Sequence, residues 1–587
     1  ETYWNANYQT YLLLKEGTSV EQLQAKIRPF IEKDLNDPNI WLSYILEPYF
    51  DVHLHSPYSA YVANTDIRYI YIASGMAVLI LLIACFTYVN MSTARSLERA
   101  REVGIRKVSG ASRKQVFVQF LGESVLIAFL ALILSIGLTM FFLPGFNGLI
   151  NRELSMKEFL HPAILGSAIA MVLVIALLAG SYPALVLSGY QPIRVLKGSF
   201  RNTGSGHQLR QSLTVFQFVI SAFLLIGSLV IFKQVRYIQS KSLGFTRDHV
   251  LLLPADNRIV KKMDLLKTRF KTNPQVKHVS LGYEAPYSIG GGYNMRSSTM
   301  SEQTALATIG NPIDEDYLKV NEIEIIAGSD LNRQDILDAE RPEEEAPYYR
   351  FIINETAARQ LGWTAEEAIG KRMFLGEGRP GEVKAVVKDF HFSTLHSPIE
   401  ALVMFPSSWG NTIMVKMSGQ EIPATLAHLE SVWKEVAPHR PFSYSFMDES
   451  YDAMYHAEQR TARIIGLFTG LAIFLACVGL LGLSAYAVQQ RTKEIGVRKV
   501  LGASVGGIVW MLTVQFLRLV AIAFVIALPL GWYAAKKWLE DFSYRTSVNL
   551  DIFFQSALGL TLFALIAISI QTIRAANLNP VRSLRSE

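Results

Sequence analysis

Long apolar segments alternate with polar segments along the chain. Seven of the apolar segments are long enough for a helix to cross the hydrocarbon core of a bilayer, which takes about 20 residues. They cover residues 69–91, 119–143, 163–187, 213–235, 464–488, 508–533 and 553–573. The pattern predicts an α-helical polytopic membrane protein with its two chain ends on opposite sides of the membrane.

The basic residues between the apolar segments predict the orientation. The segment after the first span carries Arg95, Arg99, Arg101, Arg106, Lys107, Arg113 and Lys114, whereas residues 144–162 carry only Arg152 and Lys157. The positive-inside rule places the richer segment in the cytoplasm. Alternation then makes residues 188–212, 489–507 and 574–587 cytoplasmic, and residues 1–68 and 236–463 extracytoplasmic.

The long outward segment reads as a folded domain. Residues 250–255, 276–283, 351–362 and 373–387 mix short strands, helices and tight turns, which predicts an α+β exodomain over 236–463. Residues 11–17, ending at Gly17, and residues 413–419, ending at Gly419, each predict a strand and a glycine turn before an amphipathic helix. No Gly or Pro lies between Met447 and Gly466, so we expect one continuous helix from the exodomain into the next span.

Composition narrows the class of protein. Half of the 587 residues are hydrophobic and 18% are charged, against roughly a quarter charged in soluble domains. The net charge of +6 comes from basic residues beside the spans. The chain has no basic stripe interleaved with aromatic residues, which is the pattern that would predict a nucleic-acid partner. Cys85 and Cys477 both lie in apolar segments, where we expect small packing residues and no redox pair.

An internal repeat relates the two halves of the chain. EVGIRKVSGAS at 102–112 and EIGVRKVLGAS at 494–504 share eight of eleven residues at an offset of 392, and the offset also pairs Cys85 with Cys477. QPIRVLK at 191–197 matches NPVRSLR at 579–585. A three-span unit is therefore duplicated. The span over 213–235 has no counterpart after Glu1, so we expect eight spans in the intact protein and a chain that starts within its first exodomain.

The repeated segment predicts a helical elbow. Gly110 is placed to end one helix in the left-handed conformation, and Ser112 with Gln115 has the spacing of a capping box that begins the next helix. Gly502 and Ser504 keep the corner, but Gly507 removes the reciprocal cap, so we expect the second elbow to be looser. A plain turn whose basic residues only set the topology is the alternative. The retained order of Glu, Gly, Arg, Lys, Gly, Ala and Ser favours docking to a partner.

At these residues the chain resembles the permease subunits of the MacB/FtsX superfamily of ABC transporters, whose hallmark is an E-[IV]-G-[IV]-R-K/R-x-x-G-A elbow. Residues 370–405 resemble the exodomain of its duplicated, eight-span branch. The resemblance implies two tandem FtsX-like transmembrane units with α+β extracytoplasmic domains in a bacterial plasma (inner) membrane. The expected parts are an exodomain remnant (1–68), the first unit (69–187), a linker (188–212), a helix (213–235), the second exodomain (236–463), the second unit (464–573) and a tail (574–587).

The resemblance also implies a role for the elbows. Each would rest on a cytoplasmic ATPase dimer, with the basic side chains meeting acids on that partner and one copy of the chain serving two ATPase subunits. A periplasmic adaptor or another extracytoplasmic protein, and membrane lipid, are further expected partners. The implied coupling residues are Glu102, Gly104, Arg106, Lys107, Gly110 and Ala111 in the first elbow and Glu494, Gly496, Arg498, Lys499, Gly502 and Ala503 in the second.

The chain lacks the motifs of common enzymes. It has no G-x-x-x-x-G-K-[ST] phosphate-binding loop, so we expect ATP to be bound and hydrolysed by another polypeptide and the chain itself to be no enzyme and to hold no cofactor. GEGRPG at 376–381 predicts a hairpin turn, because Pro380 and strand-like residues follow where a phosphate-binding helix would begin. We expect no metal site at His53, His55, His391 or His396, because no set of carboxylates or thiolates completes a ligand shell around them.

Three functions fit these observations. The first is a permease that uses ATPase-driven exodomain motion to export or extract an amphiphile, such as an antimicrobial peptide, a macrolide, a lipid or a lipoprotein. The alternative is a mechanical regulator or sensor that acts on an extracytoplasmic partner without transport. An ion-coupled carrier is disfavoured, because the spans bury few acidic residues.

Overall fold

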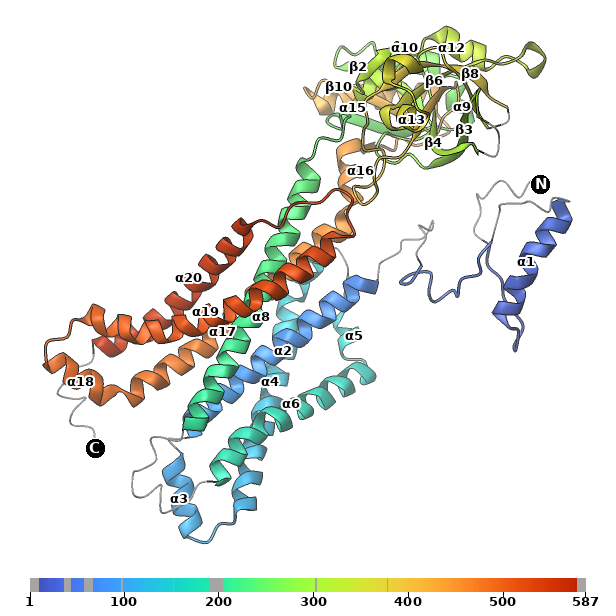
Figure 1. Cartoon of the computed structure of the whole chain (residues 1–587). Helices are drawn as coiled ribbons and strands as arrows, with labels where there is room; N and C mark the ends of the chain where they lie inside the picture. The colour runs from blue at the N-terminus through green and yellow to red at the C-terminus, as the bar shows by residue number, and fades with distance from the viewer. Residues whose placement is uncertain are drawn as a thin grey trace.

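The computed structural model describes residues 10–35, 44–56, 67–96, 99–150, 153–189, 204–300, 304–376 and 378–577. Seven of the described helices are long and apolar enough to cross a membrane, which confirms the polytopic fold (Figure 1). These helices are α2 (Ile67–Ser96), α4 (Arg113–Ile150), α6 (Pro162–Gly189), α8 (Gly204–Ser240), α17 (His456–Gln490), α19 (Val505–Leu539) and α20 (Leu550–Ala576).

The membrane helices pack as two units that share a central contact. Helices α2, α4 and α6 pack together, as do α17, α19 and α20, while α2 packs against α17. Helix α8 contacts both units, and polar groups join it to them. Gln217 of α8 donates to the Thr87 hydroxyl at 2.7 Å and to the Ile83 carbonyl at 3.1 Å. Such hydrogen bonds stabilise helix packing in the membrane, where the hydrophobic effect does not drive helices together because the lipid is itself apolar.

Two short helices lie at the end of the bundle opposite the exodomain (Figure 1). Helix α3 (Ala100–Val108) precedes α4, and α18 (Thr492–Val500) precedes α19. Two further helices lie in the first half of the chain: α1 (Val20–Leu35) and α5 (Met156–Phe159).

The exodomain is built on an 11-stranded sheet with the order β11-β1-β10-β2-β4-β3-β7-β8-β6-β9, and β5 pairs with β8. A parallel pairing of β4 with β9 closes one end of this sheet into a ring. The strands are β1 (Val250–Pro254), β2 (Val276–Gly282), β3 (Gly291–Ser297), β4 (Leu306–Ile313), β5 (Ile325–Gly328), β6 (Tyr349–Asn354), β7 (Arg372–Leu375), β8 (Pro380–Val387), β9 (Leu402–Pro406), β10 (Thr412–Met417) and β11 (Ser445–Phe446).

Shorter helices cover the sheet, and the last of them leads into the membrane helix α17. They are α9 (Asn257–Val260), α10 (Met263–Phe270), α11 (Tyr317–Asn321), α12 (Arg333–Ala339), the 3-10 turn η3 (Glu343–Glu345), α13 (Glu355–Gln360), α14 (Ala365–Ala368), α15 (Ile422–Val436) and α16 (Met447–Ala453). The amphipathic helices α10 and α15 bury Phe270 and Trp433 against β1, β2 and β10. The hairpin predicted at 376–381 joins β7 to β8, which pair antiparallel.

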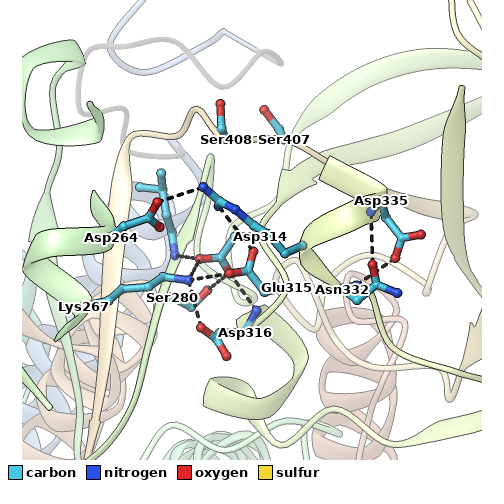
Figure 2. Close-up of polar contacts among 12 residues, drawn as sticks. Asp264, Lys267, Ser280, Asp314, Glu315, Asp316, Asn332, Asp335, Ser407 and Ser408 are labelled. Atoms are coloured by element: carbon cyan, nitrogen blue, oxygen red, sulfur yellow. Dashed lines mark hydrogen bonds and ion pairs between the residues drawn. The ribbon is translucent and has the colours of Figure 1, made fainter. Parts of the chain in front are cut away.

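A buried ion cluster fixes the exodomain interior (Figure 2). The Lys267 ammonium of α10 lies 2.8 Å from Asp314 Oδ2 and 2.8 Å from Asp316 Oδ2, at the turn between β4 and α11. Burial lowers the pKa of Lys267, but the charges and hydrogen bonds of Asp314 and Asp316 outweigh burial and raise it. Because the lysine stays charged and is bonded to both carboxylates, the cluster links α10 to the turn between β4 and α11.

Two local predictions were wrong. Residues 11–14 do not form a strand: Leu13 is fully exposed, and within the described ranges no strand pairs with this segment. The matching segment forms β10 because β1 and β2 flank it. The expected continuous helix is also broken, at Met454 and Tyr455 between α16 and α17. The break lets Tyr455 bury its ring, and its hydroxyl accepts a hydrogen bond from the Leu395 amide at 2.9 Å.

Candidate functional site

The corner of each elbow is a glycine in the left-handed conformation. Gly110 has φ +99° and Gly502 has φ +88°, where an L side chain would be strained. The next amide closes the corner, because Ala111 N–H donates to the Arg106 carbonyl at 3.0 Å and Ala503 N–H to the Arg498 carbonyl at 2.9 Å. The predicted glycine corner is therefore confirmed in both copies.

The cap after the corner differs between the copies as the sequence predicts. The Gln115 amide donates to Ser112 Oγ at 3.2 Å, and the Ser112 amide donates to Gln115 Oε1 at 2.8 Å. In the second copy the Gly507 amide donates to Ser504 Oγ at 3.2 Å, and Gly507 has no side chain to return a bond. Helix α4 thus begins with a complete capping box and α19 with half of one. The looseness expected of the second elbow stays a prediction.

A small apolar core holds each short helix against the span that follows it. Val103 packs with Val116, Phe120 and Ala184. Ile495 packs with Ile508 and Leu512, at the same offset of 392. Gly104 and Gly496 lie on this buried face. The inner face of each elbow is therefore a packing surface.

The arginine of each elbow is bonded within its own chain. Arg106 Nη2 lies 2.7 Å from Glu102 Oε1, and Arg498 Nη2 lies 2.7 Å from Glu494 Oε1. Arg106 also donates to Gln119 Oε1 at 2.6 Å, where Arg498 meets the Met511 sulfur at 2.9 Å. All four charged side chains remain about half exposed, so each pair lies at the elbow surface with donors left for a partner.

Lys107 ties the first elbow to the end of α6. Its ammonium donates to the Ser188 carbonyl at 2.6 Å, near the C-terminus of that helix, where a cation is favourable. Burial and the charge of Arg113 lower the pKa of Lys107. Lys499 occupies the matching place in α18 and is half-buried. Lys107 therefore lies on the side of the first elbow that contacts α6.

The exposed face of each elbow is apolar, which the sequence analysis missed. Ile105 and Val108 are 59% and 66% exposed on α3, and Val497 and Val500 are 47% and 63% exposed on α18. Leu501 adds a further exposed side chain in the second copy. The helical spacing of these residues could have revealed the exposed face. On such a short helix, Ile105 and Val108 cannot lie on the same inward face as Val103, and Val497 and Val500 cannot lie on the same inward face as Ile495.

A second contact missed from the sequence lies at the base of each elbow. Arg99 Nη1 lies 2.5 Å from Glu123 Oε2 on α4. At the same offset, the Gln515 amide oxygen accepts from both Nη atoms of Arg491 at 3.1 and 3.0 Å, in the amide orientation that satisfies both residues. The offset that pairs Arg99 with Arg491 also pairs Glu123 with Gln515, so the repeat could have revealed this contact.

The described residues give no sign of catalytic metal chemistry. Within the ranges that the structure covers, no group of three or more His, Cys, Asp or Glu side chains could hold a metal ion. Cys85 and Cys477 are both free thiols. The geometry of the two surface elbows suits docking to another protein, because each presents exposed apolar side chains beside a half-exposed ion pair.

Two duplicated membrane units with elbows at one end and a β-rich exodomain at the other define a multi-pass membrane protein. The FtsX-like permease C-terminal family model matches residues 74–192 and 466–580, and both matches include an elbow. The chain therefore contains two FtsX-like permease domains, is similar to ABC transporter permeases of the MacB/FtsX type, and is a multi-pass inner-membrane protein with extracytoplasmic domains.

Curated relatives match parts of the chain. The ABC transporter permease YknZ of Bacillus subtilis is 25% identical over 309 residues, 50% of this chain and 73% of YknZ. The macrolide export ATP-binding/permease protein MacB of Campylobacter jejuni is 31% identical over 121 residues, 21% of this chain and 18% of MacB. MacB of Bdellovibrio bacteriovorus is 28% identical over 124 residues and is also covered over 18% of its length.

Solved structures of extracytoplasmic domains are similar to part of the chain, at low identity. The periplasmic region of MacB from Actinobacillus actinomycetemcomitans aligns with 37% of this chain and 97% of its own, at 13% identity and a TM-score of 0.26. The extracellular domain of YknZ aligns with 33% of this chain and 97% of its own, at 16% identity and a TM-score of 0.23.

Proposed function

We propose that this permease couples ATP hydrolysis by a separate ATPase dimer to movement of its extracytoplasmic domains, and thereby exports or extracts an amphiphilic substrate. The observation that supports the proposal is the pair of elbows. Each presents an apolar outer face beside a half-exposed Glu–Arg pair, and the two faces have the same geometry at an offset of 392 residues.

The outer faces suit a protein partner better than water. Full burial of a Val, Ile or Leu side chain contributes about 1.5–3 kcal/mol, and Ile105 and Val108 expose more than half of their surface. Two elbows in one chain can engage two ATPase subunits at once, so that the second contact forms at high effective concentration. One permease chain per ATPase dimer follows from this arrangement.

The chain leaves nucleotide chemistry to that partner. It has no phosphate-binding loop, so ATP would be bound by the ATPase, and the permease would be neither an enzyme nor a cofactor protein. Movement of the ATPase would act on the permease at Glu102, Arg106, Glu494 and Arg498, and the spans would transmit it to the exodomain. A periplasmic adaptor would act at the exodomain.

An apolar groove supports an amphiphile as the substrate. The groove has a volume of about 1130 Å³ and is lined by side chains of α2, α8 and α19, among them Phe216, Phe223 and Ile526. Gln208 and Gln211 add polar groups at its cytoplasmic end. An acyl chain or apolar peptide side chain fits such a lining, and a polar headgroup fits the end.

The elbows can be tested with the purified complex. We expect the double variant Arg106→Glu with Arg498→Glu, and separately Val108→Asp with Val500→Asp, to weaken co-purification of the ATPase by about tenfold or more, since about 1.4 kcal/mol is one factor of ten. Lys434→Glu, a charge reversal at an exposed side chain of the exodomain that also pairs with a glutamate four residues away, is the control and should leave recruitment unchanged.

Unchanged ATPase recruitment by both double variants would overturn the docking assignment. Movement of a labelled amphiphile by the complex in proteoliposomes, dependent on ATP, would support transport. ATPase-driven exodomain movement without such transport would favour the mechanical regulator.

A further inference from the structure

The loop between α19 and α20, residues 540–549, packs against the base of the exodomain. Phe542 is 3% exposed and belongs to the same hydrophobic core as Phe390, Leu395 and Tyr455. Tyr544 packs against this core. An external loop between two spans would ordinarily face water, so the burial of Phe542 needs a reason.

Hydrogen bonds join this loop to an exodomain loop, residues 389–399. The Ser543 amide and hydroxyl both donate to the His396 carbonyl, at 3.2 and 2.8 Å. The Tyr544 amide donates to the Leu395 carbonyl at 3.3 Å, and the Ile399 amide donates to the Tyr544 hydroxyl at 3.4 Å. The two loops are therefore held together along their backbones.

The His396 ring links the two loops to α17. It stacks on Phe542 with 4.2 Å between ring centres. Its Nε2 lies 3.2 Å from Glu458 Oε1 in the first turn of α17, and its Nδ1 lies 3.2 Å from the Asp541 carbonyl. Burial lowers the pKa of His396, but the hydrogen bonds and charges of Glu458 and Asp541 outweigh burial and raise it. The protonated ring can donate to both oxygens at once.

The 540–549 loop is also tied to α2 and α8. Arg68 Nη1 of α2 lies 2.7 Å from Asp541 Oδ2. The buried Gln234 of α8 donates to the Tyr544 carbonyl at 3.0 Å and accepts from the Thr546 amide at 2.8 Å. The loop thus meets the exodomain, α2 of the first membrane unit and α8 at one place.

One helix connects this place to the second elbow. Helix α19 runs for 35 residues from Val505, three residues after the corner glycine Gly502, to Leu539, directly before the loop. In the first half the corresponding span α4 ends at Ile150, and the Asn147 side chain in its last turn bonds to Leu154 in the loop that follows.

We infer that the 540–549 loop and the 389–399 loop form a joint that links the second elbow, through α19, to the base of the exodomain. The inference rests on the proposed function and adds a route to it. The chain itself joins the exodomain to the membrane at α8 and at α16–α17. Two attachments leave rotation about the line between them free, and a third attachment removes that rotation. Phe542 and His396 are the positioning residues of this third attachment.

The joint can be tested on the purified chain without any ATPase. Phe542→Ala should speed hydrogen exchange of the Ser543, Tyr544 and Ile399 amides by about 100-fold, because truncating a buried Phe costs several kcal/mol of local stability. Phe554→Ala is the matched control, since Phe554 is 70% exposed on α20. Ser543→Ala, a milder change, should speed exchange in both loops by a smaller factor. Unchanged protection of the 389–399 loop in both joint variants would overturn the joint.

Coupling is then tested with the ATPase present. Cys85 and Cys477 are replaced by alanine, and spin labels are placed at the exposed Lys277 in the exodomain and Glu158 in α5. We expect a nucleotide-dependent change in the label distance in the parent and in Phe554→Ala, and its loss in Phe542→Ala with ATPase recruitment intact. An equal change in Phe542→Ala would overturn the link while the proposed function stands. No change in the parent would overturn the proposed function, and the exchange experiment would still judge the joint.

Discussion

The first elbow is held by more polar contacts than the second, although both are made by nearly the same eleven residues. In the first, Gln115 completes the cap, Gln119 accepts from Arg106, and Glu123 pairs with Arg99. The matching positions in the second are Gly507, Met511 and Gln515. The corner itself depends on the repeated residues, whereas the strength with which it is held depends on residues in the following span.

The two elbows also lead to different places. The first leads through α4 to a loop that bonds back to the last turn of α4, and the second leads through α19 to the joint under the exodomain. A softer corner at the start of the helix that carries the joint would let α18 tilt before α19 moves. The comparison therefore predicts unequal roles for two elbows that share eight of eleven residues.

The largest effect is expected from the inner face of the elbow. Val103→Ala should cost roughly 2 kcal/mol of local stability, because Val103 is 1% exposed and its truncation leaves a cavity. Val108→Ala makes the same chemical change on the exposed face of the same helix, so it should leave stability unchanged and weaken ATPase binding. Hydrogen exchange of α3 and ATPase co-purification measure the two effects separately. Equal destabilisation by both variants would contradict the division into an inner and an outer face.

The elbows were predictable from the sequence because their interactions are local. The left-handed Gly110 and the Ser112–Gln115 box involve residues within a few positions of one another, and the spans follow from the thickness of the bilayer. The missed features depend on distant partners. Residues 11–14 look like β10, but no strand among the described residues flanks them, and Tyr455 breaks a helix to reach Leu395. Phe542 sits among polar residues and gives no sign of burial, so the joint could be found only in the structure.

Exchanging the caps should have the next largest effect. Gln115→Gly should weaken the start of α4 by about 1–2 kcal/mol, since it removes the reciprocal bond and adds the helix cost of glycine. Gly507→Gln should strengthen the start of α19 by a similar amount. Gly506→Gln is the control for helix propensity, because a side chain at that position cannot return a bond to Ser504. Hydrogen exchange of the first-turn amides measures all three, and equal gains at 506 and 507 would show that the cap contributes nothing.

The smallest effect is expected at the base of the elbows. Glu123→Gln gives the first copy the arginine–amide contact of the second, and Gln515→Glu gives the second copy the arginine–carboxylate ion pair of the first. Arg99 and Glu123 are 48% and 37% exposed on their side chains, so each change should shift stability by only about 0–1 kcal/mol. The clearer readout is salt. Salt screens an exposed ion pair, so the salt sensitivity of thermal unfolding in nanodiscs should fall in Glu123→Gln, rise in Gln515→Glu and return to the parent value in the double variant. Glu430→Gln, which breaks an exposed pair with Lys434 in the exodomain, shows how much salt sensitivity any surface pair provides. A fall no larger than that of Glu430→Gln would mean that the pair at the first elbow acts as an ordinary surface contact, and the difference between the elbows would then rest on the caps alone.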